Sequence, residues 1–431
     1  MLCERSIVIN RRTDSSCLPL AVAALAILFA ACDGGERSCD SRIEVPDGFC
    51  ATLFADGVGP VRHLAVSPSG KIYAALWRES QRAGGILVLQ DTTGDGVADK
   101  RERFGPEGGS GIAIRDSLLF FATWSTVYRY TIDDREFIPT REPDRVVTSM
   151  PETEHGARSI TLGADGRLYV NVGVPSNACE RNYPARDFRG ANPCEELRTG
   201  GGIWAFDALG SDQPFDESRR FATGLRHTVA LGIAGGALYG SPHGIDHLNT
   251  WWPNAGYTRE QAASIPGETL FKIMAGGDYG FPYCMYDPRK SAMILAPAYL
   301  EADSLGKRCT TVAKPVAVFP AHAAPLALVE ITSDKFPERY RGGLFVALHG
   351  SLFHNPLPPS GYRVVFVARS TLESSGNYED FATGSNRKVG PVRMSLIRPS
   401  GLALDSAGNL YIADDNAGRI WRVSPQRSQA E

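Results

Sequence analysis

One short pattern of polar and hydrophobic positions recurs along the chain. A turn built from glycine or other small residues is followed by a run in which apolar side chains alternate with others. Such alternation is typical of a half-buried strand, and glycine supplies the positive φ that a tight hairpin turn requires. The pattern appears at residues 68–76, 115–122, 164–172, 234–240, 341–348 and 406–413. Each copy predicts a hairpin turn that leads into a strand.

The spacing of these copies predicts the architecture. Their aromatic residues are separated by 47, 49, 70, 106 and 66 residues, and are Tyr73, Phe120, Tyr169, Tyr239, Phe345 and Tyr411. A four-stranded propeller blade takes about 40–50 residues, so the longer intervals predict insertions. No long amphipathic helix separates the strands, which argues against alternating strands and helices. We therefore expect an all-β, six-bladed β-propeller with long inserted loops, although the interval of 106 residues leaves room for a seventh blade.

The ends of the chain and the inserted loops complete this expectation. A strand at residues 49–54 is expected to close the ring against the last blade, since closure leaves few free sheet edges. Functional groups concentrate on loops that a rigid scaffold positions. The inserted segments 175–200 and 243–338 are therefore where we expect the chemistry, whereas the aromatic residues of the repeats are expected to form the core.

Composition agrees with a folded protein and excludes one class of partner. The 431 residues are 43% hydrophobic and 22% charged, a normal globular balance. The formal net charge is −3. A mildly acidic chain without a basic stripe is poorly suited to nucleic acid, because neutralised phosphates supply most of that affinity. We expect no nucleic-acid partner.

The N-terminus carries the features of an export signal. Arg11 and Arg12 precede an apolar run at 18–29, which is too short to cross a membrane but suits a signal peptide. Residues 28–32 resemble a bacterial lipobox, although Phe29 departs from the usual leucine. We expect a signal peptide at 1–31, a lipidated tether at 32–42 that begins with Cys32, a propeller domain at 43–424 and a tail at 425–431. The mature protein would then be anchored on the periplasmic side of a bacterial envelope by lipid only; secretion with an incidental cysteine is the alternative.

Cysteine usage also indicates an oxidising compartment. Of nine cysteines, Cys3, Cys17 and Cys32 fall in the signal or at the lipid site. The remaining even set suggests disulfides and consists of Cys39, Cys50, Cys179, Cys194, Cys284 and Cys309. Six cysteines allow 15 connectivities, of which pairing between sequence neighbours is one. No CxxCH motif occurs, so no covalent c-type haem is built in.

Most catalytic motifs are absent. The sequence has no P-loop, no strand-coupled GxGxxG, no GxSxG and no HExxH. Residues 91–99 resemble a calcium loop, with carboxylates at Asp91, Asp95 and Asp99, and a solvated Asp-Gly turn is the alternative. His243 and His247 have the i, i+4 spacing of a helical zinc site, but Gly244 between them argues against a helix.

Several segments together resemble the glucose/sorbosone dehydrogenase family of six-bladed dehydrogenases that depend on pyrroloquinoline quinone (PQQ). The resemblance is nearest to the sorbosone dehydrogenase-like branch and runs from about Ile43 to Val423. No single motif is specific, but their order and spacing are. The segments are Val-Pro-Asp-Gly-Phe at 45–49, Arg-His-Leu-Ala-Val at 62–66, His-Gly-Ala-Arg-Ser-Ile at 155–160, Phe-Ala-Thr-Gly-Leu-Arg at 221–226, Tyr-Gly-Ser-Pro-His-Gly at 239–244, Gly-Asp-Tyr-Gly-Phe-Pro at 277–282, Pro-Ala-His-Ala-Ala-Pro at 320–325, His-Gly-Ser at 349–351 and Arg-Pro-Ser-Gly-Leu-Ala at 398–403.

The resemblance implies a set of site residues. His155 matches the general base that takes a hydroxyl proton while hydride moves to C5 of PQQ, a task that suits imidazole. Ca²⁺ would polarise the quinone and would be held by the backbone carbonyls of Gly244 and Ile245. Arg226 matches the arginine near the reactive carbonyl, and Arg398 one that binds a cofactor carboxylate.

Further positions either are expected to line the central channel of the propeller or depart from the family. His349 is expected beside the cofactor, and His322 lies in a matching segment. The family usually has asparagine where this chain has His227, and Trp-Asn-Arg where this chain has Leu-Phe-His at 352–354. The first change puts cofactor affinity in doubt, and the second puts sugar specificity in doubt.

These residues predict a PQQ- and Ca²⁺-dependent dehydrogenase of a sugar, a sugar-derived aldehyde or an alcohol outside the cytoplasm. Electrons would pass to an external acceptor, a cytochrome or a quinone, because no haem motif is present. One alternative is a non-catalytic envelope propeller that binds a protein or a glycan, since a fold does not dictate function. A calcium-dependent lactonase on a similar ring is another.

Overall fold

The computed structural model describes residues 38–77, 84–180, 186–301, 303–384, 386–389, 392–395 and 397–426. The predicted signal peptide, the predicted lipidation site Cys32 and residues 427–431 of the predicted tail lie outside the described residues. The description below concerns the compact unit Arg37–Glu431. Among its described helices, none is long and apolar enough to cross a membrane.

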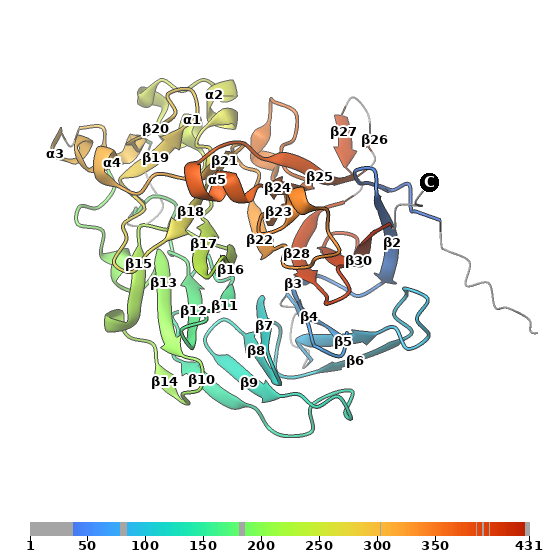
Figure 1. Ribbon diagram of the computed structural model, residues 1–431. Coiled ribbons are helices and arrows are strands. Elements are labelled where there is room, and N and C mark those ends of the chain that lie inside the picture. Colours follow the sequence, from blue (N-terminus) through green and yellow to red (C-terminus); the bar gives the residue numbers. More distant parts are fainter. Residues whose placement is uncertain are drawn as a thin grey trace, which may run out of the picture. The chain divides into compact units, whose positions relative to one another are not determined.

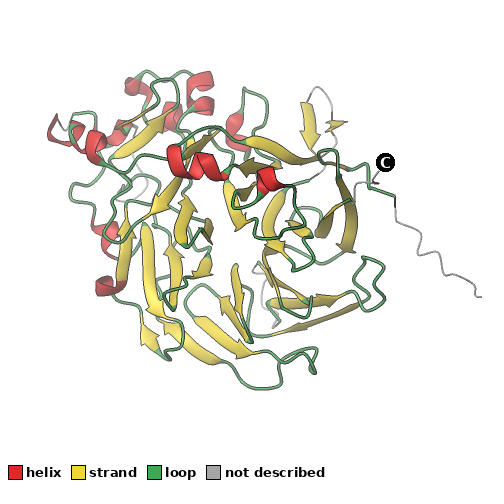
Figure 2. Ribbon diagram, viewed as in Figure 1, coloured by secondary structure: helices red, strands yellow, loops and turns green. Residues whose placement is uncertain are grey.

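Six sheets of four or five strands are arranged around a ring (Figures 1 and 2). The first strands of the six sheets contact one another in the closed order β3–β7–β11–β16–β22–β28 and so form the innermost layer. The first three blades are formed by β3 (Val61–Val66), β4 (Ile72–Leu76), β5 (Ile86–Gln90) and β6 (Lys100–Phe104); by β7 (Gly111–Arg115), β8 (Leu118–Ala122), β9 (Val127–Thr131), β10 (Asp144–Thr148) and β14 (Gln213–Pro214); and by β11 (Ile160–Leu162), β12 (Arg167–Val172), β13 (Gly202–Asp207) and β15 (Arg220–Thr223).

Of the other three blades, the last two each include one strand from the N-terminal end of the described chain. The three blades are formed by β16 (Ala230–Ala234), β17 (Ala237–Ser241), β18 (Glu268–Ile273) and β21 (Ala317–Phe319); by β22 (Pro325–Glu330), β23 (Leu344–Leu348), β24 (Arg363–Val367), β25 (Glu379–Gly384) and β1 (Ile43–Glu44); and by β28 (Pro399–Leu404), β29 (Leu410–Asp414), β30 (Arg419–Pro425) and β2 (Phe49–Asp56). The predicted six-bladed propeller is therefore confirmed. The six sequence repeats correspond to the second strands of the blades, which are β4, β8, β12, β17, β23 and β29.

The ring closes where the N-terminal strand pairs with the last strand of the chain. β2 runs antiparallel to β30, with partners from Phe49↔Pro425 to Asp56↔Arg419. The predicted closing strand is thus confirmed. Because β2 is the outermost strand of the sixth blade, residues from both ends of the chain complete that blade.

The hydrophobic core lies between neighbouring blades. Every side chain of β4 is buried, since one face packs on each adjacent sheet. The aromatic residues of the repeats are core residues, as expected, and are at most 6% exposed. Phe345, for example, lies 4.1 Å from Phe381 between ring centroids and is completely buried.

Short helices and two hairpins occupy the longer connections. Residues 242–316, apart from β18, form a small lobe at one edge of the ring (Figure 1). Among the described residues this long interval contains no seventh four-stranded sheet. The lobe contains α1 (Leu248–Trp251), α2 (Arg259–Ser264), β19 (Cys284–Asp287), β20 (Ala292–Leu295), α3 (Asp303–Gly306) and α4 (Arg308–Thr311). Elsewhere lie α5 (Arg369–Ser374) and the hairpin of β26 (Asn386–Val389) and β27 (Val392–Ser395).

Three disulfides join sequence neighbours, which selects one of the possible pairings. They are Cys39–Cys50, Cys179–Cys194 and Cys284–Cys309. The first ties the start of the described chain to β2, the second closes the connection from β12 to β13, and the third joins β19 to α4. Each disulfide closes a short loop of the chain, which stabilises the fold mainly by restricting the unfolded chain.

The closure by β2 gives a test of the fold. Phe54 on β2 is 2% exposed, and its ring lies edge-on to that of Tyr411 at 5.0 Å. We expect Phe54→Ala to cost about 3–5 kcal/mol of folding free energy, because it leaves a cavity in the closing blade. Urea denaturation followed by tryptophan fluorescence measures this cost. Asp56→Ala, which removes an exposed side chain from the same strand, is the control. Equal unfolding midpoints for the two variants would contradict this account of closure.

Candidate active site

The candidate site residues occupy equivalent positions in successive blades. One set lies just before the first strand of a blade and consists of His155, Arg226, His227, His322 and Arg398. A second set lies just after the second strand and consists of Trp77, Trp124, Gly244, Ile245, His349 and Asp415. The first two strands of every blade are antiparallel, so the start of one lies beside the end of the other. Both sets therefore meet at the same end of the ring.

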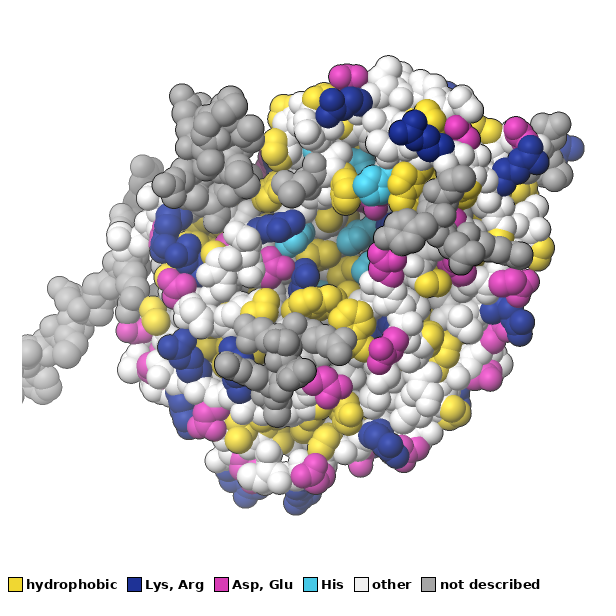
Figure 3. Space-filling view, turned by 180° about the vertical axis from the view of Figure 1, so that it is seen from behind, with side chains coloured by type: hydrophobic (Ala, Val, Ile, Leu, Met, Phe, Trp, Pro, Cys, Tyr) yellow, Lys and Arg dark blue, Asp and Glu magenta, His cyan; other side chains and the backbone are white. Residues whose placement is uncertain are grey.

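All eight histidines of the sequence belong to this region. Ring contacts and electrostatic interactions link His155, His227, His243, His247, His322, His349 and His354, and His63 lies on β3 beside Arg62. Figure 3 shows histidine side chains in a hollow of one face, with hydrophobic, basic and acidic side chains around them. Since histidine is rare in this chain, its concentration here marks the hollow as the candidate active site.

Two glycines fix the position of His155. A Cβ on Gly156 would overlap the ring of Trp124, and a Cβ on Gly173 would lie 2.7 Å from the Cβ of His155. Close packing at these two glycines therefore fixes the backbone that carries His155. Its Nδ1 lies 2.7 Å from the carbonyl oxygen of Val174. A carbonyl can only accept, so Nδ1 carries the proton and Nε2 is left as the acceptor.

The protonation of His155 suits a base. Burial and the nearby Arg226 guanidinium lower the pKa of His155 to about 3. The imidazole is thus neutral at ordinary pH. Nε2 of His155 has no hydrogen-bond partner among the described residues. It is also absent from their fully buried, unpaired polar atoms, so Nε2 is accessible.

Two further imidazoles continue from His155 in a row. The ring of His227 lies 5.1 Å from that of His155, and the ring of His243 lies 5.4 Å from that of His227. Burial lowers the pKa of His243 to about 4 and that of His227 well below its usual value. His243 Nε2 donates to the carbonyl of Pro325 at 3.0 Å, whereas Nε2 of His227 is buried without a partner. Buried polar atoms of this kind are usually paired with an ordered water or a ligand.

Most N–H groups of the Arg226 guanidinium donate hydrogen bonds to the protein. Nε and Nη2 donate to the carbonyl and side-chain oxygens of Asn177 at 3.1 and 2.9 Å, and Nη1 donates to the carbonyl of Gly244 at 2.8 Å. Nη2 also reaches the carboxylate of Asp246 at 3.3 Å. One N–H on Nη1 is left for a ligand. The guanidinium is therefore a rigidly held charge beside His155.

Asp246 joins Arg226 to His322. Its other carboxylate oxygen lies 3.3 Å from Nδ1 of His322, whose Nε2 donates to the carbonyl of Ala262 at 3.0 Å. Burial would lower the pKa of His322, but the hydrogen bond and charge of Asp246 outweigh it and raise the pKa. Burial would likewise raise the pKa of Asp246, but His322 and Arg226 lower it to about 2. The result is a row of alternating charges, Arg226⁺, Asp246⁻ and His322⁺.

A buried carboxyl group lies behind this row. Glu268 on β18 is 4% exposed and accepts a hydrogen bond from the backbone N–H of Gly244 at 2.9 Å. Burial raises its pKa to about 7. The hydrogen bond from Gly244 to Glu268 thus holds the turn at Gly244 in place.

The opposite side of the hollow is built around Asp415. Its carboxylate accepts from Nε2 of His349 at 2.9 Å and pairs with Nη1 of Arg62 at 3.0 Å. The Arg62 guanidinium lies over the Trp77 ring at 4.6 Å. Arg398 donates to the carbonyl of Gly350 at 3.2 Å. Nε of Arg62 and Nε of Arg398 are both buried without a partner among the described residues, and the two guanidinium groups bring positive charge to this side of the hollow.

The turn predicted to hold Ca²⁺ has one engaged and one free carbonyl. The Gly244 oxygen already accepts from Arg226, so a cation would share it, while the Ile245 carbonyl has no donor among the described residues. A Cβ on Gly244 would lie 2.5 Å from Cγ of Pro266, so glycine is needed for this close approach. Carbonyl oxygens suit Ca²⁺.

The predicted second calcium loop uses its carboxylates locally. Asp91 accepts from the backbone of Gly94 and Gly96, both at 2.7 Å, and Asp99 accepts from Thr92. Within the described chain, three carboxylates of this loop do not converge to within 4.8 Å of one another. This hydrogen bonding matches the alternative, a solvated Asp-Gly turn.

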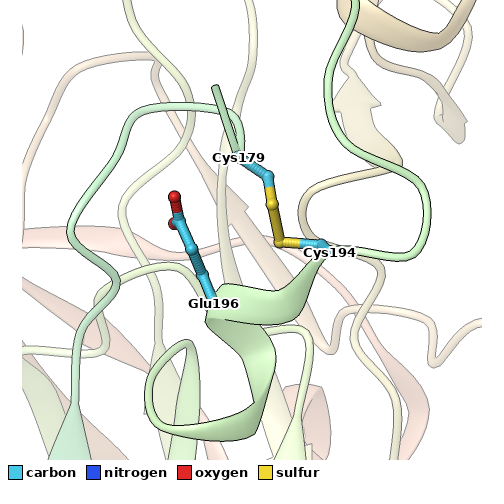
Figure 4. A group of neighbouring side chains, drawn as sticks. All are labelled: Cys179, Cys194 and Glu196. Carbon is cyan, nitrogen blue, oxygen red and sulfur yellow. A yellow bond between two sulfur atoms is a disulfide. The ribbon is translucent and has the colours of Figure 1, made fainter. Parts of the chain in front are cut away.

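A cluster of metal-ligand residue types lies elsewhere. Sγ of Cys179, Sγ of Cys194 and a carboxylate oxygen of Glu196 lie within 4.8 Å of one another (Figure 4). The two sulfurs form a disulfide, so they carry no thiolate for a metal. Burial raises the pKa of Glu196, which accepts from Ser176 at 2.6 Å.

The structure brings together His155, Arg226, His227, Gly244, Ile245, His349 and Arg398, as the resemblance implied. It leaves Asp91, Asp95 and Asp99 on the hairpin between β5 and β6, in the first blade. Sequence reasoning did not identify Asn177, Asp246, Glu268 or Asp415, and treated Arg62 only as part of a motif. Asp246 follows the predicted Ca²⁺ turn directly, and Asp415 follows a repeat strand. Both could therefore have been predicted from their positions in the sequence.

The pairing of Asp246 with His322 predicts a titration. Because the folded-state pKa of His322 lies above its unfolded value, the pair stabilises most below about pH 6.5, and this stabilisation is lost as the pH rises through the folded pKa. We expect Asp246→Asn to lower the pKa of His322, because an amide does not stabilise the imidazolium. Proton NMR of the ring C–H signals against pH measures it. His63, whose pKa burial lowers to about 4, is the internal control. Identical titration curves for His322 in the wild type and in Asp246→Asn would refute the pairing of Asp246 with a charged His322.

Comparison with known proteins agrees with this architecture. A PQQ-dependent sugar dehydrogenase of Hypocrea jecorina is 23% identical over 389 residues, which cover 78% of this chain and 82% of that protein. The calcium structure of the Trichoderma reesei AA12 carbohydrate-active enzyme superposes with a TM-score of 0.70 at 21% identity and covers 90% of this chain and 98% of that one. The holo PQQ domain of pyranose dehydrogenase from Coprinopsis cinerea gives 0.69 at 18% identity, with the same coverage of 90% and 98%.

These structural likenesses show a shared six-bladed fold. The predicted resemblance to PQQ-dependent dehydrogenases is confirmed, and the matching family is TrAA12-like rather than one named for sorbosone. The family model matches residues 43–426, nearly the whole propeller. The chain therefore belongs to the TrAA12-like family.

Proposed function

We propose that the protein is a PQQ-dependent dehydrogenase that oxidises a sugar or a related aldehyde or alcohol. The observation that carries this proposal is His155, a neutral imidazole with an accessible Nε2 beside a fixed guanidinium. That arrangement suits the removal of a hydroxyl proton. The similarity to the PQQ-dependent sugar dehydrogenase of Hypocrea jecorina and to the holo PQQ domain from Coprinopsis cinerea supports PQQ as the cofactor.

The residues at the site fit this cofactor. PQQ carries three carboxylates, and the buried Nε groups of Arg62 and Arg398 are cationic donors without partners. The orphaned Nε2 of His227 would be satisfied by a polar ligand atom in the same place.

Gly244 and Ile245 would hold Ca²⁺ through their carbonyl oxygens. Their turn is stiff, because Glu268 binds the Gly244 N–H and Pro266 packs on its Cα. The similarity to the calcium structure of the Trichoderma reesei enzyme supports calcium as the ion. Asp91, Asp95 and Asp99 are left out of this proposal, because their carboxylates are used within the hairpin.

His155 would take the substrate hydroxyl proton at Nε2 while Nδ1 stays hydrogen-bonded to Val174. When bound, PQQ with Ca²⁺ supplies an electrophilic carbonyl that accepts hydride. Arg226 holds a positive charge beside this place and is itself oriented by Asn177 and Asp246. Because His227 and His243 are neutral, they add no charge repulsion when His155 becomes an imidazolium.

We also propose the cellular setting that the N-terminal sequence implied. Cleavage before Cys32 and its lipidation would anchor the protein on the periplasmic side of a bacterial envelope. Three disulfides support an oxidising compartment. A separate cytochrome or quinone would receive the electrons.

The first test concerns the base. We expect His155→Ala to lower dye-coupled turnover with PQQ and Ca²⁺ by at least about 100-fold, because proton transfer loses its acceptor. The affinity for PQQ should stay unchanged in an absorbance titration. Glu154→Gln, an exposed neighbour on the same segment, should keep the wild-type rate. Turnover of His155→Ala near the wild-type rate would show that another group is the base.

The second test concerns the cofactor. We expect Arg398→Gln to weaken PQQ binding about tenfold or more, because a charge-assisted contact to a carboxylate is lost. Arg369→Gln, an exposed arginine on α5 that pairs with Glu373, is the matched control. Thermal shift with PQQ and Ca²⁺ measures both variants against the wild type. A wild-type protein whose midpoint does not respond to PQQ would favour the non-catalytic envelope propeller.

A further inference from the structure

The first inserted connection carries a buried asparagine that contacts the site. Asn177 lies between β12 and β13 of the third blade, whereas Arg226 and Asp246 flank β16 and β17 of the fourth. Asn177 is 7% exposed and forms hydrogen bonds with both of these residues. One side chain therefore joins two neighbouring blades at the site.

The amide of Asn177 forms a two-point contact with the backbone of Asp246. Its Oδ1 accepts from the Asp246 N–H at 2.9 Å, and its Nδ2 donates to the Asp246 carbonyl at 3.0 Å. Oδ1 also accepts from Nη2 of Arg226 at 2.9 Å, and the backbone carbonyl of Asn177 accepts from Nε of Arg226 at 3.1 Å. If the amide were turned over, its NH₂ group would face two N–H donors, so these hydrogen bonds fix its orientation.

The turn that carries Asn177 is stiffened by its own side chains. Three consecutive backbone N–H groups donate to them at 2.9, 2.6 and 2.9 Å; the donors are Asn177, Ala178 and Cys179, and the acceptors are Glu180 for the first two and Ser176 for the third. The Cys179–Cys194 disulfide ties the same turn to the start of η1 (Glu195–Arg198) (Figure 4). Cys179 has a φ of 60°, in the left-handed region that is unfavourable for cysteine, so these contacts hold it there. Asn177 is therefore presented on a fixed backbone.

We propose that Asn177 is a positioning residue that sets the spacing between the Arg226 guanidinium and the carbonyl oxygens of Gly244 and Ile245. Nη1 of Arg226 donates to the Gly244 carbonyl at 2.8 Å, and Asn177 holds the backbone of Asp246. The Ile245 carbonyl thus lies between two anchored residues, both of which contact Arg226. A fixed charge contributes to a reaction only if its separation from the other charged groups is fixed as well. This inference rests on the proposed function, because the guanidinium and the turn would serve the same cofactor and ion.

The first measurement needs no cofactor. In the full chain without PQQ, we expect Asn177→Ala to speed hydrogen exchange of the Asp246 backbone N–H at least about tenfold in NMR, because this donor loses its acceptor. Exchange of the Arg226 Nη2 protons should rise by a smaller factor, at least about threefold, because the Asp246 carboxylate still accepts from Nη2. Asn177→Asp keeps an acceptor oxygen at the same place and should restore both rates to within about twofold of the wild type. Asn254→Ala, which removes an exposed amide from the small lobe, is the matched control.

The second measurement concerns the reaction. With PQQ and Ca²⁺ bound, Asn177→Ala should lower kcat about tenfold or more while KM for the sugar stays within about threefold, and Asn177→Asp should recover most of kcat. Unchanged Asp246 exchange in Asn177→Ala would overturn the positioning role. Faster exchange throughout β16 and β17, which reports a loss of fold, would overturn it too, as would an unchanged kcat. Faster exchange confined to Asp246 and Arg226, in a protein whose wild type shows no PQQ-dependent turnover, would support the role of Asn177 and remove the dehydrogenase.

Discussion

The antiparallel pairing of the first two strands in each blade is the constraint on which the site depends. It places the residue before one strand beside the residue after the other, and the ring repeats this juxtaposition six times. Residues as distant in sequence as Arg62 and Asp415 thereby come within 3.0 Å. The site exists only if the ring is closed, and closure rests on the pairing of β2 with β30. Fold stability and site geometry are therefore coupled.

Burial at this end of the ring separates the histidines into neutral and charged groups. Desolvation disfavours charged imidazole and keeps His155, His227 and His243 neutral, which suits proton acceptance. His322 is equally enclosed, yet a carboxylate on one nitrogen and a carbonyl on the other favour its charged form. Asp246 thus decides which histidine is a cation.

The sequence predicted the fold well because blade repeats are local. A turn followed by an alternating strand is encoded in about ten residues, and the aromatic spacing then counts the blades. Site residues implied by the resemblance, such as His155 and Arg398, also meet in space. Asn177 and Glu268 could not be identified, because an amide in a loop and a glutamate in a strand have no local signature. Their importance arises from which blades face one another. The hairpin at 91–99 shows the limit of a local pattern, because the carboxylates that resemble a calcium loop accept hydrogen bonds from the backbone of the same hairpin.

The segment at 352–354 departs from the family, and an exposed ring and a charged side chain lie at this place in the structure. The family's tryptophan and arginine at this place would supply a ring and a cation. Here Phe353 supplies an exposed ring one position later, and the imidazolium of His322 lies 6.1 Å from it. His322 keeps its charge because Asp246 accepts from it, and Asp246 is itself held by Arg226. This cation lies in the connection that leads into the same blade, and Asp246 ties it to the charge beside His155. Ring and charge at this end of the row are therefore coupled to the proposed base through a continuous set of contacts.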